Sequence, residues 1–280
     1  MKNKIFLAIG LILAVSITLL IVSRVIITNQ SKKLQPADIL KVTDASKEEA
    51  QLFNTASKYS EAGDLLSAKD TYRKIMEKFP GSVNTEKAQA SLEAINVRII
   101  NSSIPTPDSI SYEVQKGDTL TKIANKFSTT GDVIMKSNNL NNPNVVPLGR
   151  KLKVHNEKMS IVVDKSMNIL TLKSGSNIVK TYTVATGINN CTPVGSFKII
   201  NKIVDPPWYT AGGVIPPESS KNILGSRWLG LSVQGYGIHG TTEPQSIGSQ
   251  ATSGCIRMKN DEVEELYALV PQGSEVVIVD

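Results

Sequence analysis

The sequence contains few of the side chains that most often carry metal and redox chemistry. Its 280 residues include only two cysteines, Cys191 and Cys255, and two histidines, His155 and His239. Two cysteines cannot build a disulfide framework, and neither Cys-x-x-Cys nor His-Glu-x-x-His occurs. This short supply of ligands argues against a zinc site, and we expect no metal ion and no cofactor.

Acidic residues are missing from the first 33 positions, which hold five lysines and arginines. Removing these five from the 31 basic residues leaves 26 against 25 acidic ones, so most of the formal net charge of +6 belongs to this end. A basic pI that arises in one terminal segment provides no basic surface for a nucleic acid. We therefore expect no nucleic-acid partner.

The one long hydrophobic run, residues 5–22, follows the basic Lys2 and Lys4. Its length matches the roughly 18 to 20 residues that a helix needs to span a bilayer. No small-x-small cleavage pattern follows it. Residues 1–28 are therefore predicted to be an uncleaved signal anchor, with a cleaved signal peptide as the alternative. The basic N-terminus favours a single-pass protein of the cell membrane whose remaining domains lie outside the cytoplasm.

Residues 36–101 are rich in Ala, Glu, Lys and Leu, a composition that favours an all-α segment. The segment resembles one tetratricopeptide repeat through seven spaced residues: Leu52, Ala56, Tyr59, Gly63, Ala68, Tyr72 and Pro80. One repeat rarely buries its own core. The predicted helical hairpin is therefore either a spacer or a surface for a protein partner. Residues 102–110, rich in Ser, Pro and Thr, are predicted to be a linker.

Residues 111–155 predict a small module with the order strand, helix, helix, strand. A turn at Gly117 leads into a helix, for which we expect Asp118 to be the N-cap. The pattern resembles a LysM domain in Gly117-Asp118-Thr119-Leu120, Ile123-Ala124, Asn138 and Gly149. The resemblance implies binding to the glycan of peptidoglycan. The expected contacts lie in the loop after the first strand and the loop between the second helix and the last strand.

Residues 159–280 predict a mostly-β domain. Alternating or β-branched patterns indicate strands at 160–163, 169–172, 178–184, 196–203 and 275–279. Turn residues between the first three strands favour a meander. Asn260-Asp261-Glu262 indicates the start of a helix that ends near Pro271. The chain as a whole is predicted to be multidomain.

His239 and Cys255 stand in a glycine-rich stretch that suits nucleophilic catalysis. An imidazole can take the proton of a thiol, and glycines let main-chain N–H groups approach a developing oxyanion. A lone cysteine is, however, more often a small buried apolar residue, and a lone histidine more often part of the core. Spacing alone leaves both interpretations open.

The same region resembles the L,D-transpeptidase (YkuD-type) catalytic domain. The resemblance rests on Thr192-Pro193-Val194-Gly195, Tyr236-Gly237-Ile238-His239-Gly240-Thr241, Ser246-Ile247-Gly248 and Gly254-Cys255-Ile256-Arg257-Met258. It implies that Cys255 is the nucleophile, that His239 is its base and that the Gly240 carbonyl orients the imidazole. It also implies that the substrate-binding residues are Arg257, Ser253, Gly254 and Thr241. Ser253 stands where many members have a second histidine.

The implied reaction is acyl transfer between peptidoglycan stem peptides through a thioester on Cys255. An amine acceptor gives a 3→3 crosslink, and water gives L,D-carboxypeptidase activity instead. A non-catalytic wall-binding protein remains an alternative, although intact His239, Cys255 and Arg257 argue against it. A sortase-like transpeptidase fits less well, because that class takes its arginine from a separate strand.

Overall fold

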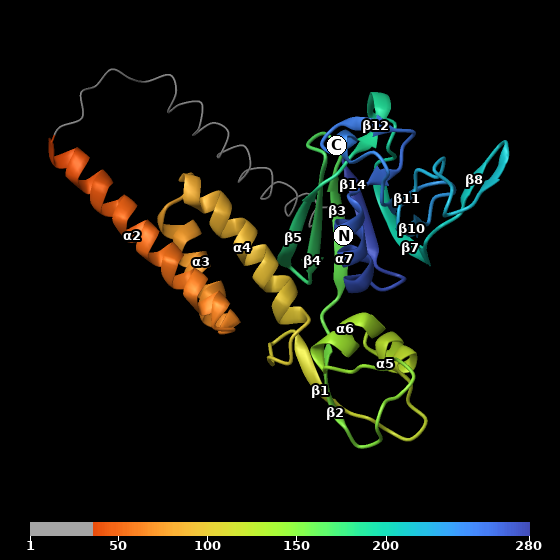
Figure 1. The fold of residues 1–280 in the computed structure, drawn as a ribbon, viewed down its shortest axis with the longest axis horizontal. Coiled ribbons are helices and arrows are strands. Elements are labelled where there is room, and N and C mark those ends of the chain that lie inside the picture. The colour runs from red at the N-terminus through yellow and green to blue at the C-terminus, as the bar shows by residue number, and fades with distance from the viewer. Residues whose placement is uncertain (1–35) are drawn as a thin grey trace, which may run out of the picture. The chain divides into compact units, whose positions relative to one another are not determined.

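The computed structural model describes residues 36–280, with side chains from residue 45 onward (Figure 1). The expected membrane anchor, residues 1–28, lies outside the described residues. Within the described part, no helix combines the length and the apolar character needed to cross a membrane. The chain forms two compact units, and the boundary between them falls between Ile95 and Asn96.

The first unit is helical where it is described. It contains α2 (Pro36–Glu61), α3 (Leu65–Lys78) and the first part of α4 (Val83–Ile100). Gly63, with φ of +81°, makes the turn between α2 and α3 in a conformation that favours glycine. The fully buried Ala56 and Ala68 let the two helices approach closely, and the Tyr72 ring packs edge-on against Phe53 with centroids 5.5 Å apart.

The second unit begins with the small module. It consists of β1 (Ser109–Glu113), α5 (Leu120–Lys126), α6 (Gly131–Ser137) and β2 (Lys151–His155). The predicted order is therefore confirmed, and β1 and β2 pair antiparallel from Ser109 opposite His155 to Glu113 opposite Lys151. Its core is formed by apolar side chains of α5, α6 and β2, among them Ile123, Ile134 and Leu152.

The expected cap of α5 was wrong by one residue. Thr119 is the N-cap, and its side chain accepts a hydrogen bond from the Lys122 N–H. Asp118 instead closes the preceding turn, because its carboxylate accepts from the Gln115 N–H and the Tyr112 hydroxyl, each at 2.8 Å. Both residues are good caps, and the turn at Gly117 decides which one faces the helix.

The C-terminal region, residues 159–280, is built on an eight-stranded mixed sheet with the order β13-β11-β10-β7-β14-β3-β4-β5. Its strands are β3 (Met159–Asp164), β4 (Ile169–Ser174), β5 (Asn177–Thr183), β7 (Gly195–Val204), β10 (Arg227–Leu231), β11 (Gly237–His239), β13 (Ile256–Arg257) and β14 (Glu275–Val279). The predicted meander is confirmed, because β3, β4 and β5 are antiparallel neighbours. The predicted last strand and the helix α7 (Asn260–Leu269) are confirmed as well.

Several elements were not expected from the sequence. They are β10, a short hairpin of β8 (Trp208–Thr210) and β9 (Gly213–Ile215), and a two-stranded pair of β6 (Thr186–Gly187) with β12 (Gln250–Thr252). Two single turns of 3-10 helix, Ile188–Asn190 and Pro244–Ser246, connect these parts. Of these elements, β10 pairs with β11, which ends in His239, and β6 lies against β13, which follows Cys255.

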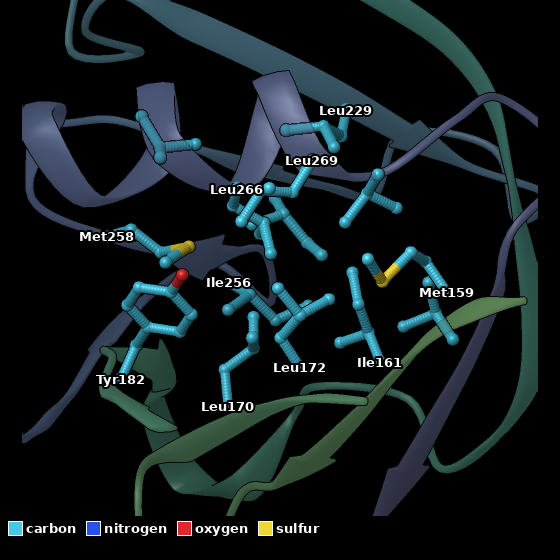
Figure 2. Packing of buried hydrophobic residues seen from close by; sticks show 14 of the residues in the cluster. Met159, Ile161, Leu170, Leu172, Tyr182, Leu229, Ile256, Met258, Leu266 and Leu269 are labelled. Carbon is cyan, nitrogen blue, oxygen red and sulfur yellow. The ribbon is translucent and has the colours of Figure 1, made fainter. Parts of the chain in front are cut away.

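The core of this domain holds those strands in place. Ile238 of β11 and Ile256 of β13 are fully buried, as is Met258 just beyond β13. Figure 2 shows Ile256 and Met258 in one cluster with Leu266 and Leu269 of α7 and with side chains of β3 and β4. Burying each such side chain contributes about 1.5 to 3 kcal/mol. The strands under the site are therefore anchored from their inner face.

Candidate active site

His239 and Cys255 are brought together by the pairing of β11 with β13. The two strands are parallel, with Ile238 opposite Ile256 and His239 opposite Arg257. Side chains two positions apart on a strand share a face, and directly opposed residues do so too. Cys255 immediately precedes β13, so it lies diagonally across from His239 on the face away from the core.

The His239 ring is buried, with 3% of the residue exposed. Its Nδ1 lies 2.7 Å from the Gly240 carbonyl oxygen. A carbonyl can only accept, so Nδ1 carries the proton and donates it, which leaves the lone pair on Nε2. Gly240 thus occupies the position in which the sequence places it. This tautomer is the one that a base for a neighbouring thiol needs.

Burial lowers the pKa of His239 to about 4, and the nearby Arg257 charge acts in the same direction. Main-chain hydrogen bonds with Gly240 and Leu224 oppose this change only in part. The imidazole is therefore neutral at neutral pH and able to accept a proton. Desolvation is the larger effect because charging a buried ring costs more than these two main-chain hydrogen bonds return.

Trp228 lies against the imidazole and was not singled out from the sequence. It is opposite His239 in the pairing of β10 with β11, and the two rings stack with centroids 5.9 Å apart at 20°. The indole N–H donates to the Asn201 side-chain oxygen at 3.1 Å, which fixes the indole. A side chain at Gly237 would meet the indole at 2.5 Å, so a glycine is required there.

The Cys255 thiol is partly exposed, and its Sγ donates to the Gly235 carbonyl at 3.6 Å. Burial raises the pKa of Cys255 above its ordinary value, and the proximity of Cys191 adds to this rise. A hydrogen bond with the Gly237 main chain and the Arg257 charge lower it in part. The resting pair is therefore a thiol and a neutral imidazole. Proton transfer has to accompany attack on the substrate.

The turn before Cys255 is tightly held. Gly254 has φ of +122°, and a side chain there would meet the Tyr236 ring at 2.6 Å. The Thr252 hydroxyl accepts from the Gly254 N–H at 3.1 Å and donates to the Cys255 carbonyl at 2.6 Å. Ser253 is exposed at the tip of this turn. The Gly254 N–H is thus already engaged.

Arg257 is almost completely buried beside the site. Its Nη1 donates to the Glu243 carboxylate at 2.7 Å and to the Ser246 hydroxyl at 3.0 Å. Its main chain exchanges two hydrogen bonds with Ala185, at 2.8 and 2.9 Å. Among the described residues its Nε has no partner. The guanidinium therefore ties the loop after His239 to β13.

Thr241, the other residue expected near the substrate, is buried in the same loop. Its hydroxyl accepts from the Glu243 N–H at 2.8 Å. Neither cysteine is in a disulfide, and Cys191 is exposed. No group of three His, Cys, Asp or Glu side chains suited to a metal ion occurs in residues 36–280.

Comparison with known proteins agrees with this geometry. Residues 158–278 match the YkuD family, described as the L,D-transpeptidase catalytic domain, and residues 112–155 match the LysM domain. A Bacillus licheniformis protein provisionally named L,D-transpeptidase YkuD is 37% identical over 174 residues, which cover 60% of this chain and 97% of that protein. This chain belongs to the YkuD family of L,D-transpeptidases.

Other relatives agree with this assignment. The Bacillus subtilis (strain 168) protein with the same provisional name is 35% identical over 179 residues, which cover 60% of this chain and 98% of that protein. Among solved structures, the catalytic domain of the Enterococcus faecium L,D-transpeptidase is 20% identical with a TM-score of 0.37, covering 45% of this chain and all of that one. Because the chain belongs to this family, the protein is an acyltransferase that acts on peptidoglycan. Its LysM domain indicates a cell-wall-associated protein.

Proposed function

We propose that this L,D-transpeptidase forms 3→3 crosslinks through a thioester on Cys255, with His239 as the base. The observation that carries this is the register of β11 and β13, which puts both side chains on one face. The neutral state of the imidazole supports it, because only an unprotonated ring can take the thiol proton.

In the first half-reaction, His239 Nε2 takes the proton of Cys255 as the sulfur attacks the carbonyl carbon of the third stem residue. The bond to the terminal D-Ala breaks, and the imidazolium returns its proton to the leaving amine. In the second half-reaction, a side-chain amine of another stem attacks the thioester and gives its proton to the imidazole. The carbon–sulfur bond then breaks, and the thiolate takes that proton back.

The oxyanion formed during both attacks needs a donor. The Gly254 N–H already donates to Thr252, which leaves the Cys255 N–H as our candidate. One such donor typically contributes about 3 kcal/mol to transition-state stabilisation. Arg257 is proposed to hold the substrate-side loop through Glu243 and Ser246, with Thr241 in the same loop. Ser253, being exposed, is proposed to border the substrate without taking part in proton transfer.

The decisive experiment incubates the full chain with tetrapeptide-stem muropeptides and measures the products by mass spectrometry. Wild type is expected to release D-Ala and to form crosslinked dimers. Cys255→Ala is expected to form neither product, whereas the matched control Cys191→Ala is expected to form both. Tripeptide stems without dimers would instead indicate carboxypeptidase activity, with water as the acceptor. Equal activity of Cys255→Ala and wild type would refute the proposal.

The remaining parts of the chain are proposed to deliver this site to the wall. We place an anchor at 1–28, a tetratricopeptide-like region at 36–101, a linker at 102–110, the LysM domain at 111–155 and the catalytic domain at 159–280. The anchor would hold the protein in the membrane with the enzyme outside, and the helical region would serve as a spacer or, alternatively, bind a protein partner. Membrane fractionation followed by external protease treatment tests the anchor, because a cytoplasmic enzyme would resist the protease.

A further inference from the structure

The peptide group between Gly240 and Thr241 is held at both of its polar ends. Its oxygen, from Gly240, lies 2.7 Å from His239 Nδ1. Its N–H, from Thr241, donates to the Asn260 side-chain oxygen at 3.0 Å. A peptide unit is planar, so fixing the direction of its N–H fixes the direction of its C=O. One rigid group thus connects Asn260 to the imidazole.

Asn260 makes further contacts with the same loops. Its Oδ1 also accepts from the Ser226 N–H at 3.2 Å, and its Nδ2 donates to the Thr241 carbonyl at 2.9 Å. It is the first residue of α7, whose Val263 and Leu266 are fully buried. Asn260 is therefore held in place by a helix that is packed into the core.

Two glycines provide the space for this amide. A side chain at Gly240 would come within 2.2 Å of the Asn260 oxygen, and so would one at Gly225. Gly240 has no Cβ, so its ψ, one of the two dihedrals that set the direction of this peptide, is less restricted than at other residues. Without the Asn260 hydrogen bond, fewer contacts would hold the Gly240 carbonyl oriented toward His239 Nδ1. The φ of Gly240 is not positive, so its backbone conformation is one that other residues also adopt. Backbone strain therefore does not explain the contacts of this peptide.

We propose that Asn260 is a positioning residue for His239. By holding the Gly240–Thr241 peptide, it keeps the carbonyl on Nδ1 and so keeps the lone pair on Nε2. A hydrogen bond donated by the N–H of a peptide also polarises its C=O, which makes the carbonyl oxygen a stronger acceptor. This inference rests on the proposed role of His239 as the base for Cys255. It gives Asn260, the first residue of α7, a role in setting the tautomer of His239.

The test compares full-chain wild type with Asn260→Ala, Asn260→Asp and the core control Val163→Ala. Val163 is a fully buried residue of β3, four strands away from β11 in the sheet order, so it lowers stability without touching the site. The ¹⁵N spectrum of labelled histidine reports the tautomer, with His239→Gln to assign the signals. Dimer formation from muropeptides gives kcat and KM.

Wild type and Val163→Ala are expected to show protonated Nδ1 on His239. Asn260→Ala is expected to add a population with protonated Nε2 and to lower kcat about tenfold to a hundredfold with little change in KM, as misplaced catalytic groups do. Asn260→Asp keeps an acceptor for the Thr241 N–H and is expected to restore the wild-type tautomer. Its carboxylate should also move the acid limb of the pH profile upward, because a negative charge favours the imidazolium.

An Asn260→Ala protein with an unchanged tautomer would overturn the inference, whether its activity fell or not. So would an Asn260→Asp protein that matched Asn260→Ala in its spectrum. If Asn260→Ala does not fold, the spectrum and kinetics of Asn260→Asp decide alone. Wild type without any activity would refute the proposed function, whereas the tautomer comparison would still test Asn260.

Discussion

His239 and Cys255 are both held in their uncharged forms by burial. The pKa of His239 is lowered to about 4, and the pKa of Cys255 is raised above its ordinary value. The Arg257 charge lowers both pKa values, which disfavours the imidazolium while favouring the thiolate. The pair therefore differs from a preformed thiolate and imidazolium. General-base catalysis during attack is the chemistry that this environment supports.

The pH dependence of kcat/KM follows from these directions. His239 must be unprotonated to act, and its folded-state pKa is about 4 against an ordinary 6.5. We therefore expect kcat/KM to hold down to about pH 5 and to fall only near pH 4. Muropeptide assays across this range measure it, with circular dichroism at each pH to separate unfolding. An acid limb near 6.5 would contradict the expectation.

Part of the site could be predicted from single residues. The scarcity of His and Cys, their glycine-rich surroundings and the motif order predict His239, Gly240 and Cys255, whose catalytic roles stay a prediction. In the structure the Gly240 carbonyl lies 2.7 Å from His239 Nδ1, and the register of β11 and β13 puts Cys255 on the same face as His239. Trp228 and Asn260 could not be found in this way. Their contacts cross strands or join a helix start to a loop 19 residues away, and no local pattern encodes such pairing.

At the scale of elements, β10 is the strand that shields His239, the proposed base. It lies between β7 and β11, so its Trp228 is held by Asn201 of β7 on one side and covers His239 of β11 on the other. Leu229 of the same strand is fully buried in the core. The strand thus keeps water from one face of the imidazole.

Removing the Trp228 indole should therefore change the pKa of His239. Trp228→Ala is expected to admit water, to raise the pKa of His239 toward 6.5 by about one unit or more, and to move the acid limb with it. Trp228→Phe is the matched control, because it keeps a ring on the imidazole while losing the hydrogen bond to Asn201. The pH profile of kcat/KM measures both. Identical acid limbs in wild type and Trp228→Ala would show that the indole does not set the pKa.

The elements that sequence patterns predicted are those with a buried and an exposed side. β3 and β4 alternate regularly in burial, and the predicted strands 160–163 and 169–172 fall within them. β10 was missed because it ends in three successive buried residues and gives no alternation. β13 has only two residues, too few for any periodic signal. Its position depends on pairing with β11, which is a property of the fold.

At the scale of the whole molecule, the family assignment joins a glycan-binding domain to an acyltransferase. The LysM loop at 141–145 is exposed over most of its length, and Pro143 and Asn144 line a polar cavity of about 630 Å³. Leu140 just before it is buried in the LysM core. The loop can therefore be changed while the domain keeps its interior.

Replacing residues 141–145 by a Gly-Ser segment of equal length should separate binding from catalysis. We expect sedimentation with insoluble peptidoglycan to weaken about tenfold or more, because a few loop contacts usually carry most of the affinity. Turnover of soluble muropeptides should stay within about twofold, since the active site is untouched. The melting temperature serves as the control for folding. Unchanged sedimentation would place the glycan contacts elsewhere.

The uncharged resting state of Cys255 also affects how long the enzyme keeps its activity. Oxidants and alkylating agents consume a thiolate far faster than a thiol. A sulfur that keeps its proton until a stem peptide docks beside His239 is thus spared from such damage while idle. Burial therefore protects Cys255, the proposed nucleophile, from oxidation and alkylation between turnovers, and in the proposed reaction proton transfer to His239 begins only when the substrate docks.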